Sequence, residues 1–396
     1  MATQTRPLKI LHLIHGLTIG GAEIDLVNKS AVLVRDYGYD ITICCLMRRG
    51  ELAEQAEAAG IKVIGPVMRH RYDITAWWFL RRLITTEFWD VVHTHIFASN
   101  LVGCLVMITI PHQNRPVFVA AEHALAERWA SLENTTTLSD GQSIAEPRGT
   151  FALWFDRFIL QHWASLILVP SVASLTSYVA RGIKREKLAV ISNTIDIERF
   201  LNIERISARK QIRAELGIPE EAYLVGTVSR LQPFKGLQVL LEAVAMLPVY
   251  WVIIGDGPCR PMLEAEIQSR NLSDRIKLLG TRSDIPAILA SLDLFAFPSY
   301  ADSFGISVAE ALLMKVPVIT TNAGGIPEVT NNSEGAYLVQ PGNVKQLADG
   351  INWMMHNPQK AQEYAQSGYL HVLSLVSPDI VAKRQHNIYQ QLVDTN

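Results

Sequence analysis

Arg230 and Lys235 stand five residues apart in the stretch SRLQPFKG, directly after the apolar run 223–229. The Arg230 guanidinium offers a planar fork of donors and the Lys235 ammonium offers a compact charge, so the two can converge on one anionic group. Such a pair would hold a diphosphate without a metal ion. The alternative interpretation is a pair of solvated surface cations.

Two carboxylates lie eight residues apart around a predicted helix start in the stretch PSYADSFGISVAEA, residues 298–311. Asp302 lies in the loop after the apolar run 293–297, and Glu310 lies about two turns along the helix. The amides of residues 303–305 open this helix, and its N-terminal end carries partial positive charge that favours anions. The pattern predicts an anion site flanked by two acids. The alternative is a buried or capping role for either acid.

Glycine turns follow two other predicted strands. Gly255 and Gly257 come after the run 250–254 in IIGDGPCR, and a missing Cβ lets the backbone approach a ligand closely. The third glycine of a dinucleotide fingerprint is absent, with Arg260 in its place. A tight strand-to-helix connection is therefore the alternative interpretation. The amide-rich turn GGIPE follows a later strand.

Metal ligands are the next candidates, because His93 and His95 alternate on a predicted strand and so point to one face. The sequence offers them no convincing third ligand, and the four cysteines form no CxxC pair. We therefore expect no metal. We also expect buried thiols and a reducing compartment.

Strands and helices must position these residues. In the first half of the chain, short β-branched runs alternate with amphipathic segments. The run 22–37 illustrates a helix, with one apolar stripe and Gly38 placed as its C-terminal stop. Alternation of this kind predicts a mostly parallel, doubly wound sheet. The predicted strands are 8–14, 40–46, 61–64, 90–95, 116–121 and 166–169.

The second half repeats the alternation after a polar, charged stretch from 196 to 221. The expected organisation is an N-terminal Rossmann-like domain over 1–195 and a second one over 196–377. The last helix, 378–396, is expected to pack back on the first domain. The predicted strands of the second half are 223–229, 250–254, 275–279, 293–297, 317–321 and 336–339.

Length and composition agree with a globular enzyme of two domains. The chain has 396 residues, of which 49% are hydrophobic and 19% charged, and no low-complexity tract interrupts it. A net charge of −2 gives no basic field, so nucleic acid is not expected as a partner. The longest apolar stretch, 101–110, is about half of what a bilayer span needs, so no membrane crossing is expected.

Seven motifs in order give the chain a resemblance to a known family. They are GGAE near the N-terminus, HTH at 93–95, EH at 122–123, SRLQPFKG, IIGDGPCR, the acidic pair eight apart, and GGIPE. Together they resemble the retaining glycosyltransferases of the GT-B fold, family 4 or group 1, over essentially the whole chain. The resemblance implies an α/β fold of two Rossmann-like domains facing across a cleft. It also implies transfer of a sugar from a nucleotide-diphosphate sugar, which is a substrate rather than a cofactor.

The resemblance also implies residue roles. Arg230 and Lys235 would bind the donor diphosphate, Glu310 would accept hydrogen bonds from the ribose, and His123 would contact the donor sugar near the reacting carbon. Asp302 takes the first acidic position, where the family usually has Glu, so its reach is shorter by about 1.5 Å. Further donor contacts are expected at Gly20, Gly21, Gly255, Ser303, Phe304, Gly305 and Ile306.

The acceptor is expected on the N-terminal half, as a glycan or a lipid-linked sugar in polysaccharide or glycolipid biosynthesis. Residues 69–82 interleave arginines with aromatic residues, a composition that suits a peripheral contact with the inner face of a membrane. The alternative is an amphipathic helix that buries its aromatics against the sheet. The expected location is the cytoplasm, with or without this membrane contact. The residues concerned are Arg69, Arg71, Tyr72, Trp77, Trp78, Phe79, Arg81 and Arg82.

Three other functions compete with glycosyl transfer. A nucleotide-sugar epimerase shares the two-domain architecture but needs no acceptor pocket. A non-catalytic binding or scaffold member of a polysaccharide assembly complex would tolerate the change at Asp302. A nicotinamide dehydrogenase would need a full dinucleotide fingerprint, which neither half contains.

Overall fold

The computed structural model describes residues 6–70, 73–123, 157, 158 and 160–395. The chain forms two compact units. The first contains the described residues up to 123, those of 157–195 and those from 376 onward, and the second contains 196–375. Among the described residues, the chain passes from the first unit to the second at 196 and returns to the first unit with its last helix.

The first unit is built on a seven-stranded sheet in the order β3-β2-β1-β4-β5-β6-β7, and each neighbouring pair is parallel. Parallel strands need crossovers, which the helices of this unit supply. The strands are β1 Lys9–Gly16, β2 Asp40–Arg48, β3 Lys62–Ile64, β4 Val91–His95, β5 Val117–Ala121, β6 Leu166–Val169 and β7 Leu188–Val190. The helices are α1 Gly21–Tyr37, α2 Leu52–Ala58, α3 Ile74–Thr86, α4 Ile96–Ile108, α7 Val172–Ala180 and α17 Pro378–Asp394, with 3₁₀ turns at His112–Asn114 and Arg185–Lys187.

The second unit is built on a six-stranded parallel sheet in the order β10-β9-β8-β11-β12-β13. Its first strand, β8, lies in the centre, where the strand order reverses direction. The strands are β8 Leu224–Val228, β9 Tyr250–Ile254, β10 Ile276–Gly280, β11 Leu294–Phe297, β12 Val318–Thr321 and β13 Tyr337–Val339. The helices are α8 Ile197–Leu201, α9 Arg205–Glu215, α10 Leu237–Ala245, α11 Arg260–Ser269, α12 Ile285–Ser291, α13 Ile306–Leu313, α14 Ile326–Val329, α15 Val344–His356 and α16 Pro358–Val376, with a 3₁₀ turn at Pro233–Lys235.

Two parallel α/β sheets confirm the predicted fold class of two Rossmann-like domains. Each predicted strand falls within two residues of an observed one, and α1 ends at Gly38, which takes a left-handed φ of 66°. The prediction omits β7, because Leu188–Val190 is only three residues long and shows little alternation.

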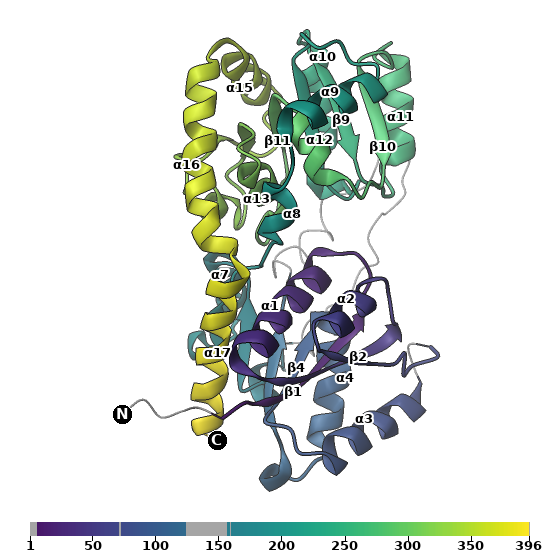
Figure 1. The fold of residues 1–396 in the computed structure, drawn as a ribbon, viewed down its shortest axis with the longest axis vertical. Coiled ribbons are helices and arrows are strands. Elements are labelled where there is room, and N and C mark those ends of the chain that lie inside the picture. Colours follow the sequence, from purple (N-terminus) through teal and green to yellow (C-terminus); the bar gives the residue numbers. More distant parts are fainter. Residues whose placement is uncertain (1–5, 71–72, 124–156, 159, 396) are drawn as a thin grey trace. The chain divides into compact units, whose positions relative to one another are not determined.

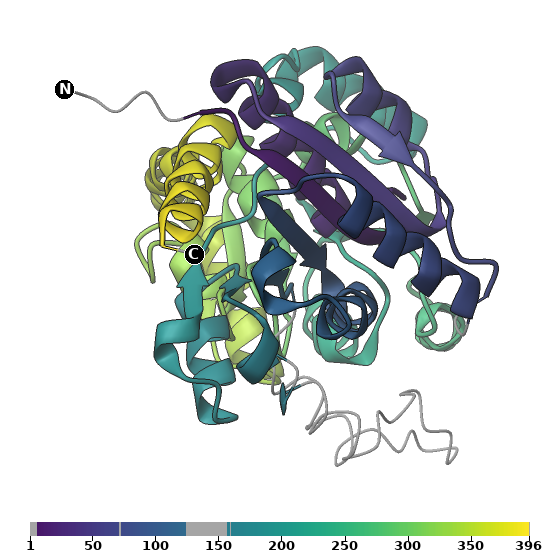
Figure 2. The same cartoon turned by 90° about the horizontal axis from the view of Figure 1, so that it is seen from below.

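The C-terminal helix α17 packs against α1 within the first unit (Figures 1 and 2). Its Tyr389 is fully buried, and Val381 and Ala382 belong to the same core as the residues of β1 and β2. Tyr39 also hydrogen bonds to His386 of this helix over 2.8 Å. The first unit thus has a core to which both ends of the chain contribute.

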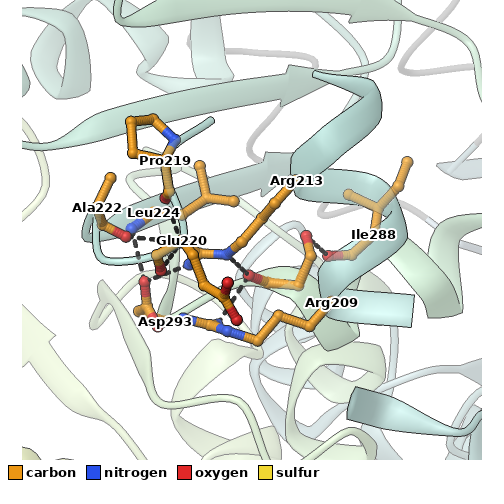
Figure 3. Close-up of polar contacts among 9 residues, drawn as sticks. Arg209, Arg213, Pro219, Glu220, Ala222, Leu224, Ile288 and Asp293 are labelled. Atoms are coloured by element: carbon orange, nitrogen blue, oxygen red, sulfur yellow. Dashed lines mark hydrogen bonds and ion pairs between the residues drawn. The ribbon is translucent and has the colours of Figure 1, made fainter. Parts of the chain in front are cut away.

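In the second unit, a buried arginine fixes α9 to the sheet. Arg213 and Arg209 of α9 both reach the Asp293 carboxylate, at 2.7 and 2.8 Å, as Figure 3 shows. Asp293 also accepts a hydrogen bond from the Leu224 amide at the start of β8. Because Arg213 is buried, loss of its carboxylate partner would leave an uncompensated charge, which typically costs about 3–5 kcal/mol. This network anchors the strand that leads to Arg230.

Candidate functional site

The predicted site of the second unit centres on an ion pair between Lys235 and Asp302. The Lys235 Nζ lies 2.5 Å from the Asp302 Oδ2, and the two side chains are only 12% and 14% exposed. Burial tends to raise the pKa of Asp302, but the Lys235 charge and two backbone amides outweigh burial and lower the pKa below its usual value. The Asp302 carboxyl is therefore ionised at neutral pH. Its partner Lys235 is the residue that the sequence predicts to bind the donor diphosphate.

Asp302 also organises the helix start that follows it. Its Oδ1 accepts hydrogen bonds from the amides of Phe304 and Gly305, at 3.1 and 2.8 Å. Gly305 caps α13 with φ 90°, a conformation that glycine adopts readily. Two of the amides that the sequence predicts to face an anion thus donate to the side chain of Asp302. A carboxylate at a helix N-terminus is itself the kind of anion that such amides stabilise.

Backbone contacts tie the surrounding loops together. The Tyr300 amide donates to the Phe234 carbonyl at 2.8 Å, so the Asp302 loop is held beside the Lys235 turn. The Gly325 amide of the GGIPE turn donates to the Asp302 carbonyl at 2.9 Å. The loops that follow β8, β11 and β12 therefore meet at one edge of the sheet, as expected for the carboxyl ends of parallel strands.

Glu310 lies on α13 and is partly buried. Burial raises its pKa to about 7, although the positive charge of Arg199 on α8 acts in the opposite direction. No hydrogen bond to its carboxylate comes from a residue that the structure describes. A carboxyl group with a pKa near neutrality, without a fixed partner, is a candidate acceptor for ligand hydroxyl groups. Arg199 lies in the polar stretch after 196, where no sequence pattern distinguishes it.

Arg230 is exposed at the carboxyl end of β8, and no described contact joins it to Lys235 or Asp302. Its loop is nevertheless fixed, because the Leu231 amide donates to the Asp256 carbonyl at 2.9 Å. Gly255 has φ 124°, and a Cβ at this position would stand 1.9 Å from the Ser229 carbonyl oxygen. The sequence assigns Gly255 to the close approach of a ligand. In the structure, a neighbouring loop of the same chain already requires a glycine there, because it leaves no room for a side chain.

In the first unit, the GGAE motif forms the start of α1. Gly20 is the N-cap residue in an extended conformation, with φ −157°, and the helix begins at Gly21. Gly20 has no side chain with which to cap the first turn, and a Cβ there would stand 2.4 Å from the Glu23 Oε2. The first amides of a helix are the kind of group that binds an anion, and a role of Gly20 and Gly21 in donor binding stays a prediction.

The EH motif follows β5 and places its two residues in different roles. Glu122 is buried and accepts hydrogen bonds from Asn100, at 2.6 Å, and Tyr178, at 3.0 Å, which is a structural role. Burial lowers the pKa of His123 to about 4, partly countered by Asp25 and a hydrogen bond with Asn193, so its imidazole is neutral at pH 7.

A small cavity of about 10 Å³ adjoins His123, which is room for about one water molecule. Lys29 of α1 lines it and forms a buried ion pair with Asp25 over 2.5 Å. Asp25 also accepts the Thr194 amide at 2.7 Å. Neither Asp25 nor Lys29 is predicted from the sequence, because their positions on α1 read as ordinary polar residues of an amphipathic helix.

The predicted membrane segment forms α3 and the loop before it, of which Arg71 and Tyr72 lie outside the described residues. Ala76, Leu80 and Ile84 are the residues that α3 buries. Its aromatic residues are not buried in the same way: Trp78 is 60% and Phe79 45% exposed, while Trp77 is partly buried. The interpretation that this helix buries its aromatics against the sheet is therefore wrong for Trp78 and Phe79. None of the helices that the structure describes is long and apolar enough to cross a membrane.

With this fold, the chain is an α/β protein of two Rossmann-like units, and comparisons with known proteins agree with that fold class. The family described as "Glycosyl transferases group 1" matches residues 208–371, and the family "Glycosyltransferase Family 4" matches residues 19–199. The chain therefore belongs to the group 1 glycosyltransferases, with a family 4 first domain.

Individual known proteins share less than a third of their aligned residues with this chain. The chain is 27% identical over 286 residues to D-inositol 3-phosphate glycosyltransferase of Mycobacterium marinum, a match that covers 69% of this chain and 57% of that protein. The chain thus spans little more than half the length of this curated relative. Among solved structures, HepE of Anabaena in complex with UDP and glucose has a TM-score of 0.81 and 23% identity, covering 96% of this chain and 99% of HepE. Sucrose-phosphate synthase of Thermosynechococcus elongatus has a TM-score of 0.78 and 20% identity, covering 98% and 100%.

Proposed function

We propose that the protein transfers a sugar from a nucleotide-diphosphate sugar to a glycan or lipid-linked acceptor, with retention of anomeric configuration. The observation that carries this proposal is the partly buried Lys235, held by Asp302 beside the start of α13. Family membership supports the reaction class. The solved complex of HepE with UDP and glucose supports the class of donor.

In this proposal, Lys235 and Arg230 contact the donor diphosphate, and the negative charge that grows on the departing diphosphate is stabilised by these cations. The start of α1 at Gly20 and Gly21 contributes backbone amides. The ion pair with Asp302 holds the Lys235 side chain in one conformation. A second contact adds to this restraint, because the Lys235 ammonium also lies 4.7 Å from the Phe297 ring centroid. A preorganised cation costs little reorganisation when charge develops during the reaction. The diphosphate therefore needs no metal ion in this proposal.

Asp302 contacts the donor sugar, as proposed from its position at the first acidic site. The carboxylate is one methylene shorter than the usual Glu, and its two oxygens already serve Lys235 and the α13 amides. A sugar hydroxyl must therefore share these oxygens. We infer that the choice of donor sugar depends on this residue.

His123 contacts the sugar near the reacting carbon in this proposal. Its low pKa keeps the imidazole neutral, so it offers a hydrogen bond rather than a positive charge that would oppose an oxocarbenium-like transition state. Retention is proposed from the family resemblance, which supplies no agreed carboxylate nucleophile.

We place the acceptor at a membrane surface, with the protein in the cytoplasm at the inner face. The exposed Trp78, Phe79 and Ile74 of α3, with nearby arginines, suit an interface with anionic lipid. Four free, buried cysteines agree with a reducing compartment. Co-sedimentation with anionic vesicles should be lost at high salt and reduced in Trp78→Ser, but not in Leu370→Ser, an exposed apolar control on α16. Failure to bind anionic vesicles at low salt would remove the membrane from the proposal.

A panel of UDP-, GDP- and ADP-sugars tests the reaction. Thermal shift identifies the donor, because a ligand that binds only the folded chain raises its melting temperature. Product analysis then separates the candidates: transfer releases nucleoside diphosphate, an epimerase returns an altered nucleotide sugar, and a scaffold binds without turnover. Only the first outcome agrees with the proposal.

A further inference from the structure

Three buried histidines lie together on two neighbouring strands of the first unit. In the parallel register of β1 and β4, His12 is opposite His93, and His95 follows on the same face two residues later. All three side chains are at most 2% exposed. The sequence shows His93 and His95 as an alternating pair but gives no sign of His12, because only the pairing of β1 with β4 brings it there.

The three rings are close enough to share one ion. One ligand nitrogen from each lies within 4.8 Å of the other two. The His12 Nδ1 and His95 Nε2 are 2.9 Å apart, and two nitrogens at about 2.1 Å from a tetrahedral Zn²⁺ would be about 3.4 Å apart. A ring rotation that moves the two nitrogens apart by about 0.5 Å therefore converts the hydrogen bond into a ligand pair.

Each ring also keeps one buried nitrogen that no described residue hydrogen bonds: the His12 Nε2, the His93 Nε2 and the His95 Nδ1. A buried polar atom without a partner is destabilising, and the His93 Nε2 is the one of these three that can complete a ligand set with the His12 Nδ1 and the His95 Nε2. Burial lowers the pKa of all three imidazoles below the usual value, which keeps them in the neutral form that binds metals.

The surroundings of His93 resemble the second coordination sphere of a metal ligand. Its Nδ1 lies 2.5 Å from the Tyr389 hydroxyl, which lies 2.5 Å from the Gln385 side-chain amide. If the amide of Gln385 turns its oxygen toward Tyr389, the His93 Nδ1 donates to Tyr389 and Tyr389 donates to Gln385. That orientation satisfies the buried Gln385 Oε1, which otherwise has no partner among the described residues, and leaves the His93 Nε2 lone pair for an ion.

We propose that His12, His93 and His95 form a buried site for one divalent transition-metal ion that accepts imidazole, with Zn²⁺ as the simplest candidate. The expectation of no metal rests on the lack of a third ligand in the sequence. In the folded chain, His12 supplies that third ligand. The ion would bind inside the first unit next to α17, whose Tyr389 hydrogen bonds to the ligand His93. It would have a structural role rather than a role at the donor diphosphate.

Metal content tests this proposal in the full-length chain. Because the site is closed, the protein should be produced in zinc-supplemented medium and also refolded with and without Zn²⁺. Elemental analysis after dialysis should give about one zinc per chain, and the metal should raise the melting temperature by roughly 5–10 °C at a hundredfold excess over Kd. Co²⁺ substitution should give the visible absorption of a nitrogen-ligated ion.

Variants locate the ion. His12→Asn, His93→Asn and His95→Asn should each lose it, whereas His15→Asn, an exposed histidine of the same strand, should keep it. Tyr389→Phe keeps every ligand and should weaken zinc affinity by about tenfold, which serves as the second test if a ligand variant fails to fold. Wild-type protein that folds with zinc present but holds no stoichiometric metal and shows no thermal shift would overturn the proposal. So would zinc that persists in all three ligand variants.

Discussion

At the scale of single residues, the site depends on how two carboxylates are placed. Asp302 is ionised and fully engaged by Lys235 and the α13 amides, whereas Glu310 is partly buried and has a pKa near 7. The sequence predicts both acids as neighbours of one helix start. It does not predict that Asp302 pairs with Lys235, because that contact depends on how the loops after β8 and β11 close on each other.

Asp302→Asn tests the ion pair. The asparagine Oδ1 can still accept from the Phe304 and Gly305 amides, so the helix start stays capped while the charge beside Lys235 is removed. Nucleoside diphosphate should bind about fivefold more tightly, consistent with about 1 kcal/mol for a partly exposed pair, while sugar transfer falls. Calorimetric titration measures the first effect and initial rates the second. Weaker diphosphate binding would contradict this account of Asp302.

Glu310 predicts a pH dependence. Its folded pKa of about 7 lies above the usual value of 4.5, so the folded state holds the proton longer and this group lowers stability as pH rises from about 4.5 to 7. Ribose hydroxyls would bind the ionised form, so nucleotide-sugar affinity should rise about tenfold between pH 6 and pH 8. In Glu310→Gln the affinity should be lower at pH 8 and nearly independent of pH. An equally steep profile in the variant would assign the dependence to another group.

At the scale of elements, the positions of strands and helices follow from local patterns, but contacts between loops do not. Helix α1 is predictable from its apolar stripe and Gly38, and the strands from their β-branched runs. β7 is too short to show a pattern, and the reason for Gly255 lies in the Ser229 carbonyl of another loop. The histidine cluster likewise needs the register of β1 on β4, which no single segment encodes.

Gly255→Ala tests the contact between loops. A methyl group 1.9 Å from the Ser229 carbonyl oxygen must displace the loop that carries Arg230, so stability should fall by roughly 1–3 kcal/mol and donor affinity should fall with it. Gly217→Ala is the matched control, because Gly217 also has a positive φ, 62°, but nothing within 4 Å of an added Cβ. Chemical denaturation compares the two. Equal losses would mean that backbone conformation alone explains the glycine.

At the scale of the whole molecule, the chain is two parallel α/β units, and the first is completed by the last helix of the sequence. Tyr389 is buried within that unit and hydrogen bonds to His93 of the central strand β4. The polar composition of this helix hides its importance, since its few buried residues are spaced among charged ones. The fold class and the return of the last helix to the first domain are both expected from the sequence, but the burial of Tyr389 beside His93 depends on long-range packing.

Truncation after residue 375 tests this dependence. Removal of α17 exposes the apolar core that Val381, Ala382 and Tyr389 cover, so the shortened chain should lose cooperative unfolding and bind a hydrophobic dye. A chain that lacks only residues 395 and 396 should behave like the intact protein. Cooperative unfolding of the chain truncated after 375 at an unchanged midpoint would show that the first unit is stable without α17.

The central claim is that the chain transfers sugar from a nucleotide donor held by Lys235. The most direct measurement is the rate of nucleoside diphosphate release from the donor identified in the nucleotide-sugar panel, compared between wild type, Lys235→Ala and the exposed-lysine control Lys345→Ala. The account predicts a rate about a hundredfold or more lower in Lys235→Ala, with a folded protein and a normal rate in the control. A folded Lys235→Ala variant that releases the nucleotide at the wild-type rate would contradict it.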